Sequence, residues 1–390
     1  MHFVVFSHLR WDFVYQRPQH LLSRAARENQ VWFWEEPLYE AELLYGAELL
    51  VERKDNVRVV IPKLPRGTEP QESQALQREL LDDLLVEISA PNLVAWYYTP
   101  MAIEFTRHLE PCVTVYDCMD ELSAFRGAPP GLRKAEAELF RRADLVFTGG
   151  HTLYESKKLQ HPSVHCFPSS IDRNFFARAR SPHSDPRDQA SIPHPRLGYC
   201  GVIDERMDLG LLAAVAEKRP DWHLVMLGPV VKISESDLPQ AVNIHYLGMK
   251  KYQELPSYFA NWDVGLLPFA LNESTRYISP TKTPEYLAAG MPVVSTPIAD
   301  VVTPYGTEGL VHIAENADAF VAAVEAALQS RTVREQRMAR VDAFLANTSW
   351  DTTWADMERL IRSVFDKKSA RQISKGRSPS AAIVAQVPGD

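Results

Sequence analysis

The chain has 390 residues, of which 45% are hydrophobic and 24% charged, and its formal net charge is -8. This is the composition of a globular protein with two or three domains, and the acidic balance argues against a nucleic-acid-binding surface. Four scattered cysteines without a CxxC pair favour a reducing, cytoplasmic location over a disulfide framework. The first apolar stretch is too short for a signal peptide, and no run approaches the ~18 apolar residues of a membrane span.

Apolar runs alternate with segments of helical periodicity along residues 1–172. Strands are predicted within HFVVFSH, QVWFWEE, NLVAWYYTP, VTVYDCM, DLVFTGG and VHCFPSSI, and helices within RPQHLLSRAARE, MAIEFTRHL, GLRKAEAELFRRA and TLYESKKLQ. Short Val, Ile and aromatic runs between helices indicate βαβ units, and their continuous apolar character fits a parallel sheet buried on both faces. We therefore assign residues 1–172 to a Rossmann-like domain.

The pattern stops at 173–195, a stretch rich in Pro, Ser and Arg, which we interpret as a linker. It restarts at 196–348 with strands predicted in RLGYCGVI, WHLVMLGP, VNIHYLG, DVGLLPF, MPVVSTP and GLVHIA. Residues 349–366 are predicted to form an amphipathic helix that returns to the first domain, and 367–390 a disordered tail. The predicted fold class is α/β, with two doubly wound parallel-sheet domains that face each other across a cleft.

In open α/β sheets ligands bind beyond the carboxyl ends of the strands, so the cleft is the expected site. Arg206 follows the strand RLGYCGVI, with Gly201 in the same turn. A cation near a helix N-terminus favours an anion. The alternative is a loop arginine paired with Asp204 or Asp208.

The segment SPTKTPEYLAAG, residues 279–290, places one lysine and one glutamate at a short helix. Thr283 is expected to cap this helix and Gly290 to end it. The helix N-terminus, Lys282 and the hydroxyl of Thr281 suit a diphosphate, while Glu285 can accept hydrogen bonds from a ribose diol. The alternative is that Glu285 only complements the helix dipole and Lys282 faces solvent.

Three acidic residues follow the strand in VYDCMDELSAF: Asp117, Asp120 and Glu121. A carboxylate at a strand end beside a cleft can act as a general base, and we choose Asp120 for this role. One of the three is expected to cap the next helix.

The loop after the first strand carries Trp11, Asp12, Arg17 and His20, which are candidates for contacts with a sugar or an acceptor phosphate. Trp11 fits a place in the core equally well. Arg17, with Arg24 and Arg27 on the same helix, could also face a membrane surface, although such arginines are more often solvated.

Several familiar signatures are absent from the sequence, namely GxGxxG after a first strand, GxxxxGK[ST], GxSxG and zinc-type His/Cys spacing. No Asp-x-Asp pair suggests a metal–diphosphate site. We therefore expect no cofactor and no metal, with charge neutralisation by Lys282, Arg206 and helix dipoles.

The segments GYCGVIDERMD and SPTKTPEYLAAGMPVVST resemble those of GT-B nucleotide-sugar glycosyltransferases, in particular glycosyltransferase family 4 enzymes of bacterial polysaccharide synthesis, including teichuronic-acid-type transferases. The resemblance covers about residues 1–365. It implies that Arg206 contacts the donor diphosphate and Glu285 the ribose. The family often carries Glu-x7-Glu, but the first position here is Tyr277, and Glu273 is the nearest upstream acid; either could lie by the donor sugar.

VYDCMDELSAF and SPTKTPEYL also resemble xanthan-type glucuronosyltransferases, which implies a base role for Asp120 and a donor role for Lys282. Those enzymes invert the anomeric centre, whereas family 4 mostly retains it, and we favour retention. The expected reaction moves a sugar from a UDP- or GDP-sugar to a surface polysaccharide or lipid-linked glycan, with peripheral contact at the inner membrane face. Alternatives are a nucleotide-sugar 2-epimerase and a non-catalytic sugar-nucleotide-binding protein.

Overall fold

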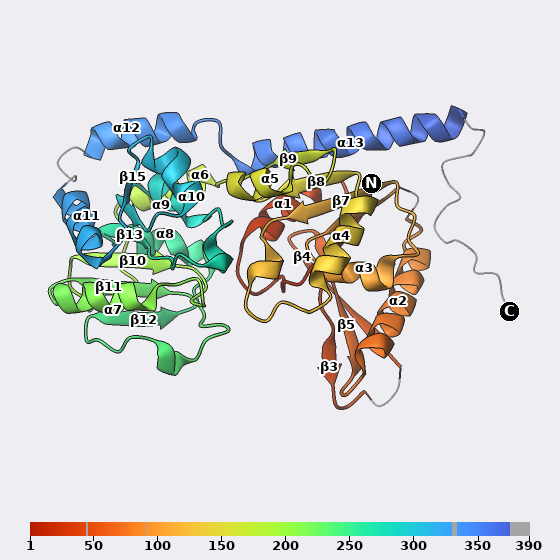
Figure 1. Cartoon of the computed structure of the whole chain (residues 1–390), viewed down its shortest axis with the longest axis horizontal. Helices are drawn as coiled ribbons and strands as arrows, with labels where there is room; N and C mark the ends of the chain where they lie inside the picture. Colours follow the sequence, from red (N-terminus) through yellow and green to blue (C-terminus); the bar gives the residue numbers. More distant parts are fainter. Residues whose placement is uncertain (44–45, 91, 330–333, 375–390) are drawn as a thin grey trace.

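The computed structural model describes residues 1–43, 46–90, 92–329 and 334–374, which form two domains side by side (Figure 1). The strands of the N-terminal domain form one sheet in the order β3-β5-β2-β1-β6-β7-β8-β9, with β4 paired to β5. Its strands are β1 (His2–Phe6), β2 (Gln30–Trp34), β3 (Leu38–Glu40), β4 (Glu48–Lys54), β5 (Val57–Pro65), β6 (Leu93–Tyr97), β7 (Val113–Cys118), β8 (Leu145–Thr148) and β9 (Val164–Cys166). Only the β4–β5 pair of these described strands is antiparallel.

The C-terminal domain has a parallel sheet in the order β12-β11-β10-β13-β14-β15. Its strands are β10 (Arg196–Cys200), β11 (His223–Leu227), β12 (Ile244–Gly248), β13 (Val264–Leu267), β14 (Val293–Ser295) and β15 (Val311–Ile313). In both sheets the first strand lies inside the sheet, β1 between β2 and β6 and β10 between β11 and β13. The order in which strands are added reverses at these switch points, which is where doubly wound sheets bind ligands.

Helices cover both sheets, and most of them follow the predicted periodicity. They are α1 (Arg17–Ala25), α2 (Pro70–Glu87), α3 (Ile103–Thr106), α4 (Leu132–Arg142), α5 (His151–Lys157), α6 (Arg173–Ala177), α7 (Leu209–Lys218), α8 (Leu255–Phe259), α9 (Lys282–Ala289), α10 (Ala299–Val301), α11 (Ala317–Gln329), α12 (Arg334–Leu345) and α13 (Trp350–Ser374). The sequence pattern did not indicate α2, α12 or the strands β3 to β5, because their apolar residues are interspersed with charged ones in no clear period.

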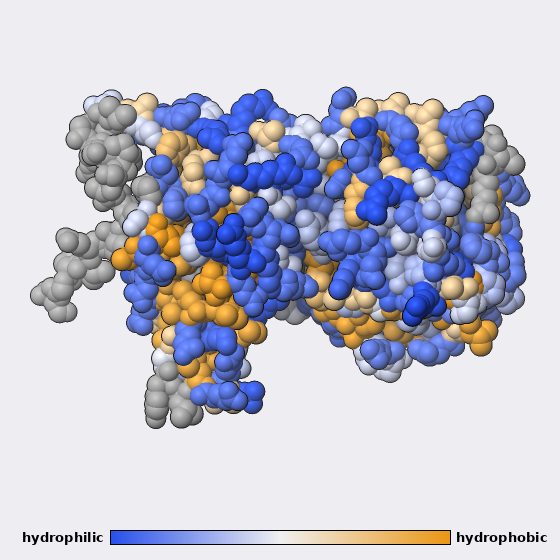
Figure 2. Space-filling model, turned by 180° about the vertical axis from the view of Figure 1, so that it is seen from behind, coloured by the Kyte–Doolittle hydropathy of each residue, from blue (hydrophilic) through white to orange (hydrophobic). Residues whose placement is uncertain are grey.

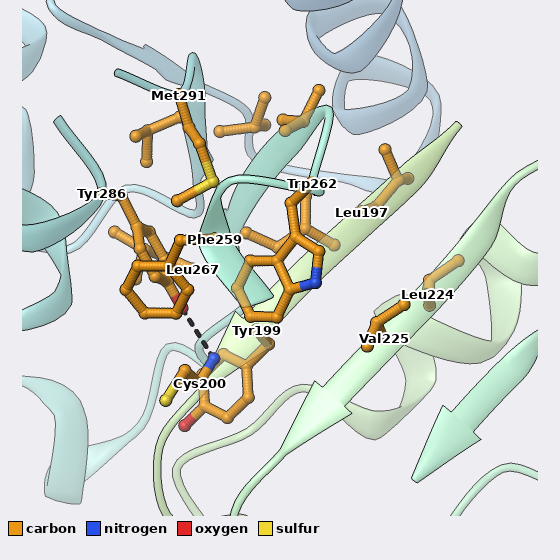
Figure 3. Close-up of a cluster of buried hydrophobic side chains, with 14 of the residues drawn as sticks. Leu197, Tyr199, Cys200, Leu224, Val225, Phe259, Trp262, Leu267, Tyr286 and Met291 are labelled. Carbon is orange, nitrogen blue, oxygen red and sulfur yellow. Dashed lines mark hydrogen bonds between the residues drawn. The ribbon is translucent and has the colours of Figure 1, made fainter. Parts of the chain in front are cut away.

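The apolar strand residues build the cores as the pattern requires. In β1, Phe3 and Val5 pack into one cluster and Val4 and Phe6 into another, on opposite faces of the sheet. In the C-terminal domain one cluster holds Trp262 and Tyr286 at its centre (Figure 3). This burial on both faces explains why the strands read as uninterrupted apolar runs.

The chain passes from one domain to the other twice, and the two connecting segments are hydrogen-bonded to each other. The backbone N–H of Trp350, the first residue of α13, donates a hydrogen bond to the carbonyl oxygen of Ile171 at 3.3 Å. From there α13 runs back over the N-terminal domain (Figure 1). Arg24 and Arg27 of α1 both bind Asp351, so these arginines join α1 to α13 instead of forming a free basic face.

Two predicted boundaries need correction. The segment 173–195 is not a free linker, because it contains α6 and because Phe176 and Ile192 are buried in the core of the C-terminal domain. The predicted tail at 367–390 begins too early, since α13 continues to Ser374. Residues 375–390 lie outside the described part of the chain.

A buried carboxylate also joins the domains. Asp300 of α10 is 3% exposed and accepts hydrogen bonds from the backbone N–H groups of His151 and Thr152, at 2.8 and 2.9 Å. These groups begin α5 of the N-terminal domain, so a residue of one domain caps a helix of the other. Gly150 permits this approach, because a Cβ there would lie 2.3 Å from the Asp300 carboxylate.

Hydrophilic residues dominate the surface seen in Figure 2, with an apolar area on the N-terminal domain. The exposed large apolar side chains of this domain include Leu38, Tyr39, Leu50 and Val51 of β3 and β4. Among the helices of the described ranges, none combines the length and apolarity that crossing a bilayer requires.

Candidate functional site

Three cavities meet between the domains at the carboxyl ends of the strands. The central cavity, about 140 Å³, is lined by Arg17, Asp120, Gly201, Arg206, Thr281 and Lys282, among others. The β11 cavity, about 750 Å³, shares Gly201 and Lys282 with it, and the β7 cavity, about 530 Å³, shares Asp120 and Arg206. The central cavity therefore lies between two larger cavities, and residues predicted from both halves of the sequence line it.

Asp120 stands in the loop after β7 and lines both the central and the β7 cavity. Burial raises the pKa of its carboxyl to about 6, although the charges of Arg206 and Arg17 act in the opposite direction. In the described part of the chain, its carboxylate has no hydrogen-bond or ion-pair partner within the protein. A carboxylate in this state is available to a substrate and titrates near the pH at which a general base works best.

The neighbouring acids are already bound. Asp117 is fully buried and receives three hydrogen bonds of 2.9 to 3.1 Å from the guanidinium of Arg17. Arg17 is itself 4% exposed, so it holds the end of β7 in place and is a structural residue at the edge of the cavity. Glu121 forms an ion pair of 2.8 Å with Lys157. Neither Asp117 nor Glu121 caps a following helix, which corrects that expectation.

Lys282 and Glu285 form a buried ion pair at the first turn of α9. Burial by itself lowers the pKa of Lys282, but the charge of Glu285 outweighs it and raises the pKa, so the ammonium stays protonated. Lys282 lines the cavity, whereas Glu285 is 2% exposed behind it. A ribose can therefore reach the Glu285 carboxylate only after Lys282 has moved from it.

The helix that carries this pair begins two residues earlier than predicted, at Lys282. Thr281 occupies the N-cap position, without a side-chain capping bond, and lines the central cavity. Thr283, the predicted cap, lies inside the helix, and its hydroxyl is buried without a partner in the described residues. Gly290 ends the helix with a φ of 92°, as predicted.

Tyr286 fixes α9 to the end of β10. Its hydroxyl oxygen accepts a hydrogen bond from the backbone N–H of Cys200 at 2.6 Å, which Figure 3 shows as a dashed line. Gly201 follows directly, and its carbonyl oxygen would lie 1.8 Å from a Cβ on Gly228. The strand ends of β10 and β11 thus approach closely, and the two cavities share Gly201.

Arg206 is bound by Asp204 in the arrangement left open as the alternative. Its Nε and terminal nitrogen donate to the two carboxylate oxygens at 2.9 and 2.7 Å. Arg206 nevertheless lines the central and β7 cavities, and its charge lowers the pKa of Asp120. The guanidinium is therefore held beside the catalytic candidate, with its orientation set by Asp204.

The other residues predicted to contact the acceptor lie in different places. Trp11 is 5% exposed and packs against Phe33, with one edge in the β11 cavity. Asp12 lines the same cavity and binds Lys54. His20 is 2% exposed and stacks on Trp350 at 4.7 Å; burial lowers its pKa well below the usual value. His20 thus belongs to the packing of α1 against α13 and does not line these cavities.

The two residues considered for the donor sugar also lie outside these cavities. Tyr277 packs against the N-terminal core and under Arg276. Glu273 is exposed in a short 3-10 turn.

Two residues that the sequence did not single out lie at the site. Lys232 and His8 line the β7 cavity, and the charge of Lys232 acts on both Asp120 and His8. Lys232 has a φ of 64°, unusual for a residue other than glycine. The one signal in the sequence for these two residues is that each lies shortly after a predicted strand.

Within the described ranges no group of three or more His, Cys, Asp and Glu side chains could hold a metal ion. The expectation that no metal takes part stays a prediction.

Residues 194–330 match the protein family described as "Glycosyl transferases group 1". The chain is 27% identical over 241 residues to TuaH of Bacillus subtilis (strain 168), a protein named as a teichuronic acid biosynthesis glycosyltransferase. The matched stretch covers 56% of this chain and 59% of TuaH, so the chain spans less than two thirds of that relative.

Solved structures share the whole architecture. The sucrose-phosphate synthase of Thermosynechococcus elongatus superimposes with a TM-score of 0.69 at 15% identity, over 94% of this chain and 99% of that one. An α,α-trehalose-phosphate synthase (UDP-forming) of Burkholderia xenovorans, in complex with glucose-6-phosphate, gives 0.67 at 12% identity over 92% and 99%. A trehalose-6-phosphate protein of E. coli bound with UDP-2-fluoro glucose gives 0.62 at 15% identity over 99% and 100%. These likenesses confirm the predicted GT-B fold.

Proposed function

We propose that this chain, whose residues 194–330 form a glycosyl transferases group 1 domain, is a glycosyltransferase that uses a nucleotide-diphosphate sugar. The observation that carries the proposal is the position of Asp120. An unpaired carboxylate with a pKa of about 6 lines the same small cavity as Lys282, Arg206 and Thr281. A proton acceptor thereby faces groups suited to a leaving diphosphate.

The donor occupies the C-terminal side of the cleft. Its diphosphate lies against Lys282, Arg206 and the N-terminus of α9, where positive charge stabilises the negative charge that develops as the sugar leaves. The β11 cavity, next to Lys282 and Gly201, has the volume for a nucleoside. The solved structure of the same fold that holds UDP-2-fluoro glucose supports a UDP-sugar, with a GDP-sugar as the second choice. We expect the reaction to need no metal.

The acceptor occupies the β7 cavity, on the other side of Asp120. In an inverting reaction Asp120 removes the proton from the attacking hydroxyl. In a retaining reaction, which the family 4 resemblance favours, it orients the acceptor while the leaving diphosphate takes the proton. The anomeric configuration of the product, read from its proton NMR coupling, distinguishes the two courses. The name of TuaH supports a cell-surface polysaccharide as the acceptor, acted on in the cytoplasm at the inner membrane face.

Thermal unfolding with UDP, GDP, ADP and dTDP tests the donor site. A nucleotide at about 100 times its Kd adds roughly 2.7 kcal/mol to the stability of the native protein. We expect one nucleotide to raise the midpoint of the wild type and to leave the Lys282→Ala, Glu285→Ala double variant unchanged. No shift with any nucleotide would contradict the donor assignment.

Turnover measurements distinguish the proposed function from its two alternatives. A 2-epimerase would convert a UDP-sugar without an acceptor, so release of free epimerised donor would favour it. A non-catalytic binding protein would bind the nucleotide and show no turnover. Asp120→Asn would then change neither the nucleotide binding nor the turnover.

A further inference from the structure

The β7 cavity has a cation that the proposed donor site does not use. Lys232 follows β11 in the C-terminal domain, and its ammonium lies 4.9 Å from the ring of Phe125 in the N-terminal domain. Its nearest carboxylate oxygen, Oε1 of Glu205, is 3.9 Å away, beyond a direct hydrogen bond. Lys232 therefore carries a charge that the described residues neutralise only weakly.

The backbone holds this lysine in place. The N–H of Val231 donates to the carbonyl oxygen of Ile203 at 3.0 Å, and the N–H of Ile203 donates to that of Pro229 at 2.9 Å. The loops after β10 and β11 are thus joined directly before Lys232, which has a left-handed φ of 64°. Because this backbone conformation is costly, the surrounding structure must hold it in place. Here it holds the Lys232 side chain toward the N-terminal domain, across the cleft.

The other cationic side chains of the cavity differ in whether a carboxylate already binds them. Arg10 is paired with Glu35 at 2.8 Å, and Arg206 is held by both oxygens of Asp204. Arg126, in contrast, makes one contact among the described residues, in which its backbone N–H donates to the Glu205 carboxylate at 3.2 Å. Its guanidinium and the Lys232 ammonium are the two charges left for a ligand in the described lining of this cavity.

The floor of the cavity suits a sugar. His8 has an unpaired, buried Nδ1, and burial together with the charge of Lys232 lowers its pKa to about 4, so the imidazole is neutral at pH 7. Leu122 and Phe125 add apolar surface, and the volume of about 530 Å³ accommodates a hexose.

We propose that the β7 cavity binds an acceptor sugar that carries a carboxylate or a phosphate, and that Lys232 and Arg126 bind this anionic group. The inference rests on the proposed function, since it names the substrate class of the acceptor side. Charge-assisted hydrogen bonds to one ammonium and one guanidinium would orient the sugar so that its reacting hydroxyl faces Asp120. A neutral sugar would lack these bonds and bind more weakly.

The test is equilibrium binding to the full chain saturated with UDP, so that the donor diphosphate site is filled. The probes are inorganic phosphate, glucose 6-phosphate, glucuronate and glucose. We expect the anionic probes to bind at least tenfold more tightly than glucose. The ratio of glucose 6-phosphate to glucuronate tells whether the site prefers a phosphate or a carboxylate.

A double variant and a control variant assign the effect to the cavity. Lys232→Gln with Arg126→Gln should weaken the anionic probes about tenfold or more and leave UDP binding unchanged. Arg133→Gln, on the exposed face of α4, should change neither. If UDP binds but the anionic probes bind no better than glucose, or bind the double variant equally well, the inference is wrong. If UDP does not bind, the proposed function itself fails.

Discussion

The backbone N–H of Cys200 donates to the hydroxyl oxygen of Tyr286 at 2.6 Å, and this bond sets the distance between β10 and α9. Cys200 lines the central cavity, and Tyr286 follows Glu285 directly in α9. The loop that presents Arg206 and the helix that presents Lys282 are thereby held together from behind. The geometry of the proposed diphosphate site depends on a residue that does not line the cavity.

Tyr286→Phe should therefore affect both stability and nucleotide binding. The substitution leaves a buried N–H without a partner, which costs about 1–3 kcal/mol of unfolding free energy. Urea unfolding measures this loss, and titration with UDP measures the expected fall in affinity. Tyr246→Phe is the control, because its hydroxyl bonds to Pro239 away from the site. Equal UDP affinity in Tyr286→Phe and wild type would show that α9 is placed by other contacts.

The Lys282–Glu285 pair should behave as a buried ion pair. Lys282→Met leaves the Glu285 carboxylate buried alone and is expected to cost about 3–5 kcal/mol. Adding Glu285→Gln should recover most of that stability without restoring nucleotide binding. For comparison, Lys158→Met breaks an exposed pair with Glu155, which solvent screens, and should change the stability far less. Chemical denaturation of the wild type and the three variants gives these values. If Lys282→Met alone is as stable as Lys282→Met with Glu285→Gln, the two side chains are not coupled.

Asp120→Asn should lower turnover about 10²- to 10⁴-fold while UDP still binds, because general-base catalysis contributes about this much. Since the pKa of Asp120 is about 6, wild-type turnover should fall as the pH drops below 6 and the carboxylate takes up a proton. The initial rate with a donor and an acceptor between pH 5 and 8 measures this. A pH profile flat across 6 would exclude an essential ionised Asp120.

The same substitution should raise stability at neutral pH. The folded protein holds the Asp120 carboxyl with a pKa of about 6, above the roughly 3.9 of an unfolded chain, so the folded state binds the proton more tightly. The contribution of Asp120 to stability is therefore fully present below about pH 4 and is lost as the pH rises through 6. Asp120→Asn lacks this decrease, and unfolding at pH 4 and pH 7.5 should show a gain of about 1–3 kcal/mol only at the higher pH. Asp12→Asn, on an exposed acid, is the control.

Asp300→Ala should loosen the contact between the domains. The variant loses the cap of α5, at a cost of about 0.5–2 kcal/mol, and with it a link across the cleft. Asp208→Ala removes a comparable cap, the bond of 2.8 Å to the N–H of Leu211, entirely within the C-terminal domain. Small-angle scattering should show a larger radius of gyration for Asp300→Ala alone. An equal radius in both variants would mean that Asp300 contributes only local stability.

The sequence predicted the parts of the fold that depend on local pattern. Buried strands such as Phe3–Phe6 read as apolar runs because both faces are covered, and Gly290 marked the end of α9 because its φ is positive. The hairpin of β4 and β5 escaped prediction because its exposed face mixes apolar and charged residues.

Residues that line the cavities were indicated where they follow a strand, and were not indicated where their place depends on partners far along the chain; their roles stay predictions. Asp117 and Arg17 are separated by 100 residues, so their pairing could not be read from either segment. Lys232 reaches Asp120 only because the two domains close on each other. His20 was misassigned because Trp350, which covers it, lies at the start of α13.

The hydrogen bond between Trp350 and Ile171 gives both chain crossings a common pivot. Once the other contacts across the cleft separate, such as the Asp300 cap of α5, the two domains stay joined at this point and can turn about it but not slide apart. Opening of the cleft is then a rotation about this point, and displacement grows with distance from it. In Figure 1 the tip of β3 and β5 lies far from the pivot, so it would sweep the longest arc while the groups around Asp120 shift far less.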